Sequence, residues 1–467
     1  LEAKGETDKA YNFYYKAYWA ADCVAKAMTK IAVIDIKRKD YKEAVRHAEN
    51  ALDYGRNNNL AIAALAIAKK ELGENISEIA EKQLKADSID HMMKFIAEKE
   101  DLYAAMDSDA VQTCFDIAFD LSAMGRYEDV LKLLSGLYEK RPDYRRKMLY
   151  YAIGYFKNLM GESGTEYYEK AKGAELGKCY PSRFEEIAIL EDVISKTGHE
   201  EAKMLLGCIY YNKLQYKKAA SLWEECKNCY IAKRNLAVAY FSHLGRENEA
   251  LSLMKEVLGE REDDEQLLYE TVVLMDKMGV NPKEKINLIL SHKVSRDDCL
   301  TELSKAYNQA FMPDKAIETL MSHDFVPCEG GEHAIADQYM FAYLVKGKRE
   351  FEKGNIESAK KLFEEGQILP QSLGAGIWNH CKLIPLKYHQ ALCLKKLGEK
   401  ETLKPKETEE IKETTSNNMS LAIVVNGKRQ RTFPQKYEGY EASSVTCTNG
   451  ASGTWDNEAW NITIDNI

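Results

Sequence analysis

One pattern of small and aromatic residues recurs along this chain and constrains its fold more than any other feature. The clearest copy has Gly207, then Tyr210 one helical turn later, then Ala219 and Trp223, and it ends near Cys226. Two antiparallel helices approach closely only where small side chains meet, so this spacing predicts a helical hairpin. Because the spacing recurs, the sequence predicts a stack of such hairpins.

Matching positions occur elsewhere with different degrees of regularity. The good copies contain Ala118, Val130, Leu134 and Pro142, with Gly125 ending the first helix; Ala32, Ala44, Ala48 and Ala51; and Gly347, Ala359 and Phe363 before Pro370. The degenerate copies contain Ala237, Tyr240 and Ala250, with one extra residue in the turn, and Ala152, Tyr168 and Ala171, with Gly164 in place of Ala. A generic helix bundle has a period of about 3.6 residues but no reason for small residues at matched places.

The spacing is that of tetratricopeptide repeats. The sequence therefore predicts an all-α fold, a tetratricopeptide-like α-solenoid of about six to nine antiparallel helix hairpins, followed by a short C-terminal β segment. Composition agrees, because 9 Pro and 27 Gly among 467 residues leave little room for a loop-rich fold.

Charge and hydropathy narrow the classes of partner. The net charge of -9 provides no basic stripe for phosphates, so we expect no nucleic-acid partner. No apolar run reaches the roughly 18 residues of a spanning helix, so no membrane partner is expected. The most apolar stretch, LAIAALAIAKKELG from Leu60, is interpreted as a buried helix.

The 11 Cys are scattered without the spacing of a disulfide framework, which favours a reducing, cytoplasmic location. Cys226 and Cys229 form a C-x-x-C, which is typical of a metal or redox site only with a second pair or a strand-loop-helix context. We therefore interpret them as packing residues and expect no metal and no cofactor. The chain starts at Leu1, within what resembles a hairpin, so we expect a fragment of a longer protein.

Three segments are predicted: helical repeats over residues 1–398, a charged linker over 399–418 and a small β-rich tail over 419–467. The linker is dense in charge and poor in apolar residues, which prevents packing. Within the tail, Asn426-Gly427 between two apolar runs is a hairpin signal. The triplet beginning at Asn461 matches a glycosylation pattern, which we attribute to chance.

A glycine-rich loop precedes one predicted helix. Two glycines allow a sharp turn, and carboxylates are favoured at a helix start, so this loop is a helix cap or a ligand site. Its residues are Glu329, Gly330, Gly331, Glu332 and His333. Gly374 and Gly376 follow the repeat that this loop introduces, so both loops are expected to lie near each other.

Together with Gln338 and Tyr339, these motifs resemble the C-terminal part of bacterial tetratricopeptide proteins that carry an N-terminal, uncharacterised mutarotase-like β-sandwich domain. The sequence departs from that family at Cys328, His333 and Ala375, where the family has Trp, Gly and Glu. The resemblance implies the repeat half of a protein associated with carbohydrate metabolism, without an established reaction. A catalytic pair of Glu329 and Glu332 requires a set carboxylate separation that loop spacing does not establish.

Two hypotheses for function follow. In the first, a non-catalytic scaffold binds a peptide or partner protein in the concave groove of the repeats, which the first helices line. The predicted groove residues are Met204, Tyr211, Asn212, Arg234 and Phe241; the alternative role of the aromatic ones is packing between repeats. In the second, the repeats belong to a carbohydrate-binding or carbohydrate-active protein whose N-terminal domain is absent from this chain.

Overall fold

The computed structural model describes residues 5–106, 110–177, 180–326, 332–376 and 380–398, together with the backbone of five strands between residues 419 and 464. The chain divides into two compact units, Leu1–Cys393 and Leu394–Ile467. Within the described ranges, no helix combines the length and apolar character needed to cross a bilayer.

The first helices along the chain are α1 (Thr7–Ala17), α2 (Val24–Lys37), α3 (Tyr41–Tyr54), α4 (Asn59–Glu71), α5 (Ser77–Ala86), α6 (His91–Ile96), α7 (Ala110–Ala123), α8 (Tyr127–Lys140), α9 (Lys147–Leu159), α10 (Thr165–Ala171) and α11 (Glu185–Thr197). The remaining α-helices are α12 (Glu200–Asn212), α13 (Tyr216–Glu224), α14 (Tyr230–Ala239), α15 (Glu247–Glu260), α16 (Glu265–Lys277), α17 (Pro282–Leu290), α18 (Asp297–Gln309), α19 (Pro313–Met321), α20 (Glu332–Glu352), α21 (Ile356–Glu365) and α22 (Ile384–Leu397). Short 3-10 turns are η2 (Ala21–Cys23), η3 (Pro142–Tyr144), η5 (Gln371–Leu373) and η6 (His380–Leu383).

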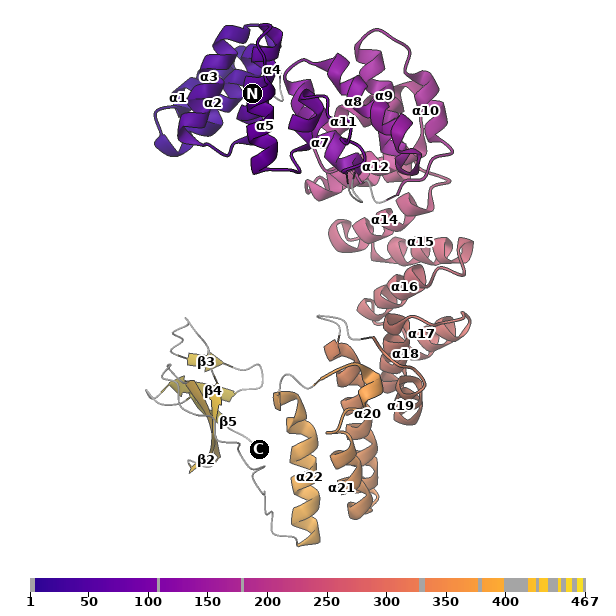
Figure 1. The fold of residues 1–467 in the computed structure, drawn as a ribbon. Coiled ribbons are helices and arrows are strands. Elements are labelled where there is room, and N and C mark those ends of the chain that lie inside the picture. Colours follow the sequence, from indigo (N-terminus) through magenta and orange to yellow (C-terminus); the bar gives the residue numbers. More distant parts are fainter. Residues whose placement is uncertain are drawn as a thin grey trace. The chain divides into compact units, whose positions relative to one another are not determined.

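In the first unit, consecutive helices pair as antiparallel hairpins, and each hairpin packs against the next one along the chain (Figure 1). The pairs include α2/α3, α7/α8, α12/α13, α14/α15, α18/α19 and α20/α21. Ala219 and Ala359, the small residues of two second helices, have no exposed surface. The repeat prediction is therefore confirmed: the helices form a row of hairpins that bury one another's flanks.

The hairpins close because an aromatic ring of the second helix occupies the space beside a glycine of the first. A Cβ added to Gly207 would lie 2.3 Å from Nε1 of Trp223, and one added to Gly347 would lie 2.4 Å from Phe363. In the degenerate hairpin α9/α10, Gly154 makes the same kind of contact with Tyr168. Real Cβ atoms do not approach this closely, so the packing of these hairpins requires glycine.

The extra residue predicted in the turn after Ala237 is accommodated inside the helix. Tyr240–Leu244 forms a π-helical turn, η4, which continues α14. The backbone N–H of Arg246 then donates to the carbonyl of Tyr240 at 3.0 Å. A π-turn adds one residue without changing the packed face, so Ala237 and Ala250 are both buried as the repeat requires.

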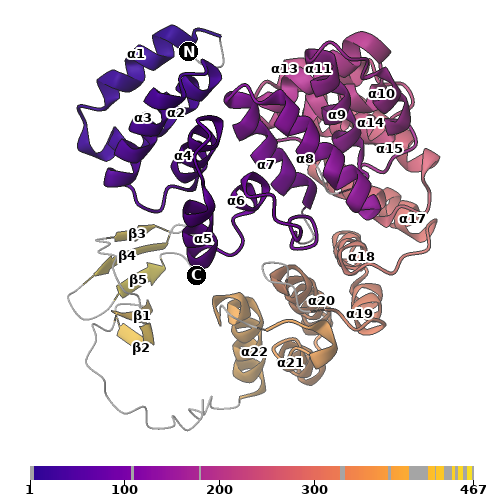
Figure 2. The ribbon, with the colours of Figure 1, turned by 45° about the horizontal axis from the view of Figure 1, so that its top comes forward.

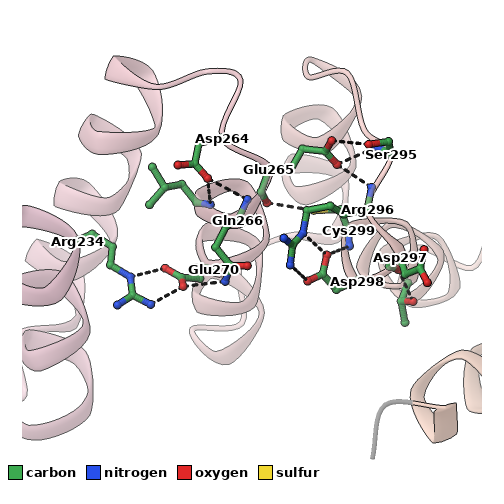
Figure 3. Close-up of polar contacts among 12 residues, drawn as sticks. Arg234, Asp264, Glu265, Gln266, Glu270, Ser295, Arg296, Asp297, Asp298 and Cys299 are labelled. Carbon is green, nitrogen blue, oxygen red and sulfur yellow. Dashed lines mark hydrogen bonds and ion pairs between the residues drawn. The ribbon is translucent and has the colours of Figure 1, made fainter. Parts of the chain in front are cut away.

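A recurring polar contact joins successive hairpins, which we call the hairpin clasp. An acidic residue at the first position of a first helix accepts backbone N–H groups from the segment that leads into the next first helix (Figure 3). The pairs are Glu200 with Asn228 at 2.8 Å, Glu265 with Ser295 and Arg296 at 2.8 Å each, and Asp297 with Val326 at 2.9 Å. The clasp therefore satisfies backbone donors that the helices leave unpaired.

The N-terminal helix α1 lies alongside α2 and α3 (Figure 2). Its attachment is largely polar, since the Tyr11 hydroxyl donates to Asp35 at 2.8 Å and the Tyr15 hydroxyl contacts His47 at 2.5 Å. Asp35 and His47 are themselves buried, and Nδ1 of His47 lies 2.6 Å from Oδ2 of Asp35. Ala10 is the only fully buried residue of α1, so this network makes an important contribution to its docking.

The second unit contains the strands β1 (Met419–Val425), β2 (Lys428–Gln435), β3 (Ser444–Thr446), β4 (Ala451–Trp455) and β5 (Trp460–Ile464). They pair in the order β2-β1-β5-β4-β3, with β1 and β5 parallel and the other pairs antiparallel. The turn at Asn426-Gly427 lies outside the described residues. The division into repeats, linker and β-rich tail stays a prediction.

The glycine contact predicts a specific cost of substitution. Gly207→Ala is expected to destabilise the chain by about 1–3 kcal/mol, because the new methyl group displaces the Trp223 ring, which donates to the carbonyl of Met204 at 3.0 Å. Gly259→Ala, in the last turn of α15 with no atom within 4 Å of the added Cβ, is the matched control. It is expected to be neutral or slightly stabilising. Urea unfolding of both variants checks this, and equal losses would contradict the packing argument.

The clasp predicts a pH dependence. Burial raises the pKa of Glu265, but hydrogen bonds from Ser295 and Arg296 outweigh burial, so the pKa lies below its ordinary value. This contribution to stability is therefore present at neutral pH and is lost as the pH falls through the lowered pKa. Glu265→Gln is expected to cost about 1 kcal/mol at pH 7 and to reduce the acid-induced loss of stability. Thermal unfolding between pH 3 and 7 checks this.

The exposed Glu262 provides the control for that measurement. Glu262→Gln is expected to leave both the stability at pH 7 and its decrease in acid unchanged. If the two variants behave alike, the clasp does not stabilise the stack.

Candidate functional site

The face built by the first helices α12, α14, α16 and α18 carries the candidate site. Arg234 on α14 reaches to Glu270 on α16, donating from Nε at 2.7 Å and also from a terminal nitrogen (Figure 3). Its other terminal nitrogen donates to the side-chain oxygen of Asn235 at 2.9 Å. This bidentate pairing fixes the guanidinium plane.

The pair is asymmetric in its exposure to solvent. The Arg234 side chain keeps 37% of its surface exposed, whereas that of Glu270 keeps 15%. A guanidinium has five N–H donors, and three take part in the hydrogen bonds to Glu270 and Asn235. Two donors of Arg234 thus have no hydrogen bond within the described residues, and they belong to the more exposed partner.

Two further side chains border this guanidinium. Tyr180, which precedes α11, keeps 46% of its surface exposed. Burial raises the pKa of its phenol, and the nearby charge of Arg234 opposes that increase. Asn235 donates to Sγ of Cys208 on α12 at 3.5 Å. We call Tyr180, Cys208, Arg234, Asn235 and Glu270 the Arg234 patch.

An acidic cleft of about 560 Å³ adjoins the patch. Its lining residues come from the end of α15, the turn that follows, the start of α16 and the segment before α18: Glu260, Arg261, Glu262, Asp263, Asp264, Glu265, Gln266 and Arg296. Gln266 links the two features, because its amide donates to Glu270 at 3.0 Å. Arg296 is paired with Asp298 at 2.6 Å, so the cleft has an excess of carboxylates.

Polar contacts continue along the same face towards α20. Asp276 accepts from Lys285 and, at 2.8 Å, from Lys305. Burial raises the pKa of Asp276, but Lys285 and Lys305 outweigh burial and hold it well below its usual range. Asn308 donates to the carbonyl and side-chain oxygen of Gln338 at 3.0 and 3.1 Å. From α12 to α20, each first helix is thus connected to the next by polar side chains.

The structure places the five predicted groove residues in different environments. The prediction was wrong for Met204. Its side chain is 1% exposed and belongs to the core, because it packs inside the hairpin rather than on the open face. Tyr211 is half-buried, its hydroxyl lies 3.0 Å from Nε2 of His243, and its ring packs against Trp223. Asn212 is exposed at the end of α12, and Phe241 is half-buried below Lys277. Only Arg234 has contacts that lead into a larger polar patch.

The structure describes only part of the predicted glycine-rich loop. Glu329, Gly330 and Gly331 lie outside the described residues, and Glu332 and His333 are described only as the helical start of α20. Tyr339 is buried. Phe325, four residues before Glu329, donates its backbone N–H to the carbonyl of Ser372 at 2.8 Å, two residues before Gly374. The proximity of the two loops themselves stays a prediction.

The other motif glycines have ordinary positions. Gly374 ends η5 with a left-handed backbone, at φ 57°, and Gly376 is exposed. Gln338 accepts a hydrogen bond from Asn308 through its side-chain oxygen. Whether these residues form a ligand site stays a prediction.

The C-x-x-C motif agrees with a packing role. Cys226 is buried and its Sγ donates to the carbonyls of Leu222 at 3.3 Å and Glu200 at 3.4 Å. Burial raises the pKa of the Cys226 thiol to about 12, which lowers its reactivity at neutral pH.

Sequence reasoning missed Tyr180, Glu270 and the cleft residues. Tyr180 belongs to an irregular segment, where repeat spacing gives no position. Glu270 was not recognised because its partner is on another hairpin. An available signal was the acidic residue at the first position of α12, α16 and α18, which recurs in register.

The ion pair between Arg234 and Glu270 predicts a measurable change in the pKa of Glu270 when Arg234 is replaced. Burial raises the pKa of Glu270, and hydrogen bonds from Arg234 and Gln266 outweigh burial, so the pKa lies below its ordinary value. Arg234→Gln removes the cation, and the pKa of Glu270 is expected to rise by about one unit or more. A carbon-13 NMR titration of the Glu270 carboxyl checks this; an unchanged pKa would show that the pair does not form in solution.

No family model matches the chain. It is similar to a tetratricopeptide repeat protein from Parabacteroides merdae, at 12% identity over 62% of this chain and 100% of that chain, with a TM-score of 0.25. It is also similar to yeast Tom70, at 12% identity over 84% of this chain and 93% of that chain, with a TM-score of 0.26. A thermophilic tetratricopeptide protein of Thermus thermophilus matches at 16% identity over 46% of this chain and 98% of that chain, with a TM-score of 0.20.

Scores this low carry no argument about function. The architecture rests instead on the packing described above, in which glycine, alanine and aromatic residues occupy matched places in successive hairpins. The chain is a helical-repeat protein with tetratricopeptide-like hairpins.

Proposed function

We propose that the chain is a non-catalytic scaffold that binds an extended peptide segment of a partner protein on the face of its first helices. The observation that carries this proposal is the Arg234 guanidinium, which is fixed by Glu270 and Asn235 while two N–H donors remain for a ligand. A donor held in place before binding loses little conformational freedom when the partner arrives.

The chemistry of the patch fits a peptide backbone. Carbonyl or carboxylate oxygens accept from Arg234, and an apolar side chain packs on the exposed ring of Tyr180. The adjoining cleft, with its excess of carboxylates, suits basic side chains of the same segment. An extended peptide presents these groups at intervals along one strand, as other helical scaffolds require of their ligands.

Several finer predictions remain proposals. The carbohydrate alternative depends on Glu329, Gly330 and Gly331, which lie outside the described residues. No contact within the described ranges favours it over peptide binding. A bacterial origin, a cytoplasmic location, the missing mutarotase-like domain and the separate β-rich tail also stay predictions.

Selection of peptides from a random display library on the whole chain tests the proposal. Selected peptides are expected to bind with micromolar affinity and to lose about ten- to a hundredfold on Arg234→Ala, because one charge-assisted hydrogen bond contributes about 1.5–3 kcal/mol. Fluorescence polarisation with labelled peptides provides the measurement.

Arg246→Ala is the matched control. Its side chain is 38% exposed, and it is paired with Glu224 and Glu249 as Arg234 is with Glu270, but it lies at the start of the second helix α15. Peptide affinity is expected to be unchanged in this variant. Equal losses in both variants, or binding to a glycan array without any peptide binding, would contradict the proposal.

A further inference from the structure

The segment between α10 and α11 makes contacts far from its place in the sequence. Arg183 donates to Oδ1 of Asp116 on α7 at 2.9 Å, across 67 residues of sequence. The hairpin α9/α10 lies between these two residues along the chain. The segment therefore reaches back past its neighbouring hairpin to an earlier first helix.

The Arg183 side chain packs against one face of α7. Asp116, Phe119 and Asp120 are three and four positions apart, which places them on the same side of the helix. The guanidinium carbon lies 4.9 Å from the centre of the Phe119 ring, and burial raises the pKa of Asp120, which the charge of Arg183 opposes. Gln112 donates to Asp116 at 3.2 Å and orients its carboxylate. Two carboxylates beside an aromatic face match a guanidinium.

The same segment also borders the Arg234 patch. Tyr180 belongs to the patch, and Pro181 between it and Arg183 is buried. The backbone N–H groups of Ser182 and Arg183 donate to Oε2 of Glu186 at 2.7 and 2.8 Å. Five consecutive residues, 180–184, thus run between α7 and the patch with one aromatic side chain at each end.

The Arg183 contacts are exposed enough to be exchanged. Its side chain is 32% exposed and that of Asp116 is 55% exposed. Ion pairs with this exposure contribute little to stability. An incoming arginine that makes the same contacts therefore competes at small cost.

We propose that Asp116, Phe119 and Asp120 form an arginine-recognition site, that Arg183 of the chain itself occupies this site, and that an arginine-bearing extended segment of a partner protein displaces it. This inference rests on the proposed function and specifies the chemistry of the partner. The chain's own segment acts as an internal competitor, which lowers the apparent affinity by the fraction of molecules in which the site is closed.

A labelled peptide that copies residues 180–186 is the probe. It is titrated into the whole chain, into Arg183→Ala and into Arg183→Ala combined with Asp116→Asn. Because an internal competitor acts at a high effective concentration, Arg183→Ala is expected to bind the peptide about tenfold more tightly than the unchanged chain. The added Asp116→Asn is expected to remove that gain.

Arg141→Ala is the control, because Arg141, like Arg183, forms a bidentate pair with a carboxylate two residues later, and it belongs to neither the Arg234 patch nor the acidic cleft. It is expected to bind the peptide as the unchanged chain does. Arg183→Gln, which removes the guanidinium but keeps a polar side chain, replaces Arg183→Ala if thermal unfolding shows that the alanine variant is not folded.

Two results would overturn the inference: no gain in affinity on removing Arg183, or equal binding of a peptide whose arginine is replaced by alanine. These results leave the proposed function intact if library peptides still depend on Arg234. Loss of the Arg234 dependence, with the Arg183 gain retained, would instead refute the proposed role of the patch and keep the arginine site.

Discussion

Each described hairpin of the glycine type depends on one contact, between an aromatic ring on the second helix and a residue without a side chain on the first. At Gly207 the Trp223 ring fills the volume that a Cβ would need, and at Gly347 the Phe363 ring does the same. This contact sets how closely the two helices approach. Since the next hairpin packs on the flank that this pair presents, the spacing between such a hairpin and its neighbour also depends on it.

Polar groups then act on a framework that apolar packing has already set. The clasp residues Glu200, Glu265 and Asp297 pair with backbone N–H groups of the following segment, so they connect one hairpin to the next. Arg234 and Asp276 extend these connections across the first helices. The candidate site is therefore part of the polar connection between hairpins, and its geometry depends on their stacking.

The sequence predicted the elements whose spacing is imposed by packing. Ala219, Ala359 and Trp223 have matched positions because the helix crossing admits few alternatives, and the structure buries all three. Met204 was misplaced because a shift of one position along a first helix turns a side chain from the open face towards the core, and the repeat spacing alone does not fix that position.

Contacts between hairpins could not be predicted from the sequence. Arg234 was recognised from its position, but Glu270 was not, because pairing across hairpins depends on the rotation between successive repeats. Tyr180 and Arg183 lie in an irregular segment, where no period applies. The π-turn after Ala239 shows the same limit, since the extra residue was seen while its accommodation within the helix was not.

We propose that the first helices form the binding face and that the second helices support it. Hydrogen–deuterium exchange of the whole chain, with and without a peptide selected from the library, tests this claim most directly. The account predicts slower exchange in α12, α14 and α16 on binding, with α13, α15 and α17 unchanged. Protection confined to the second helices would contradict it.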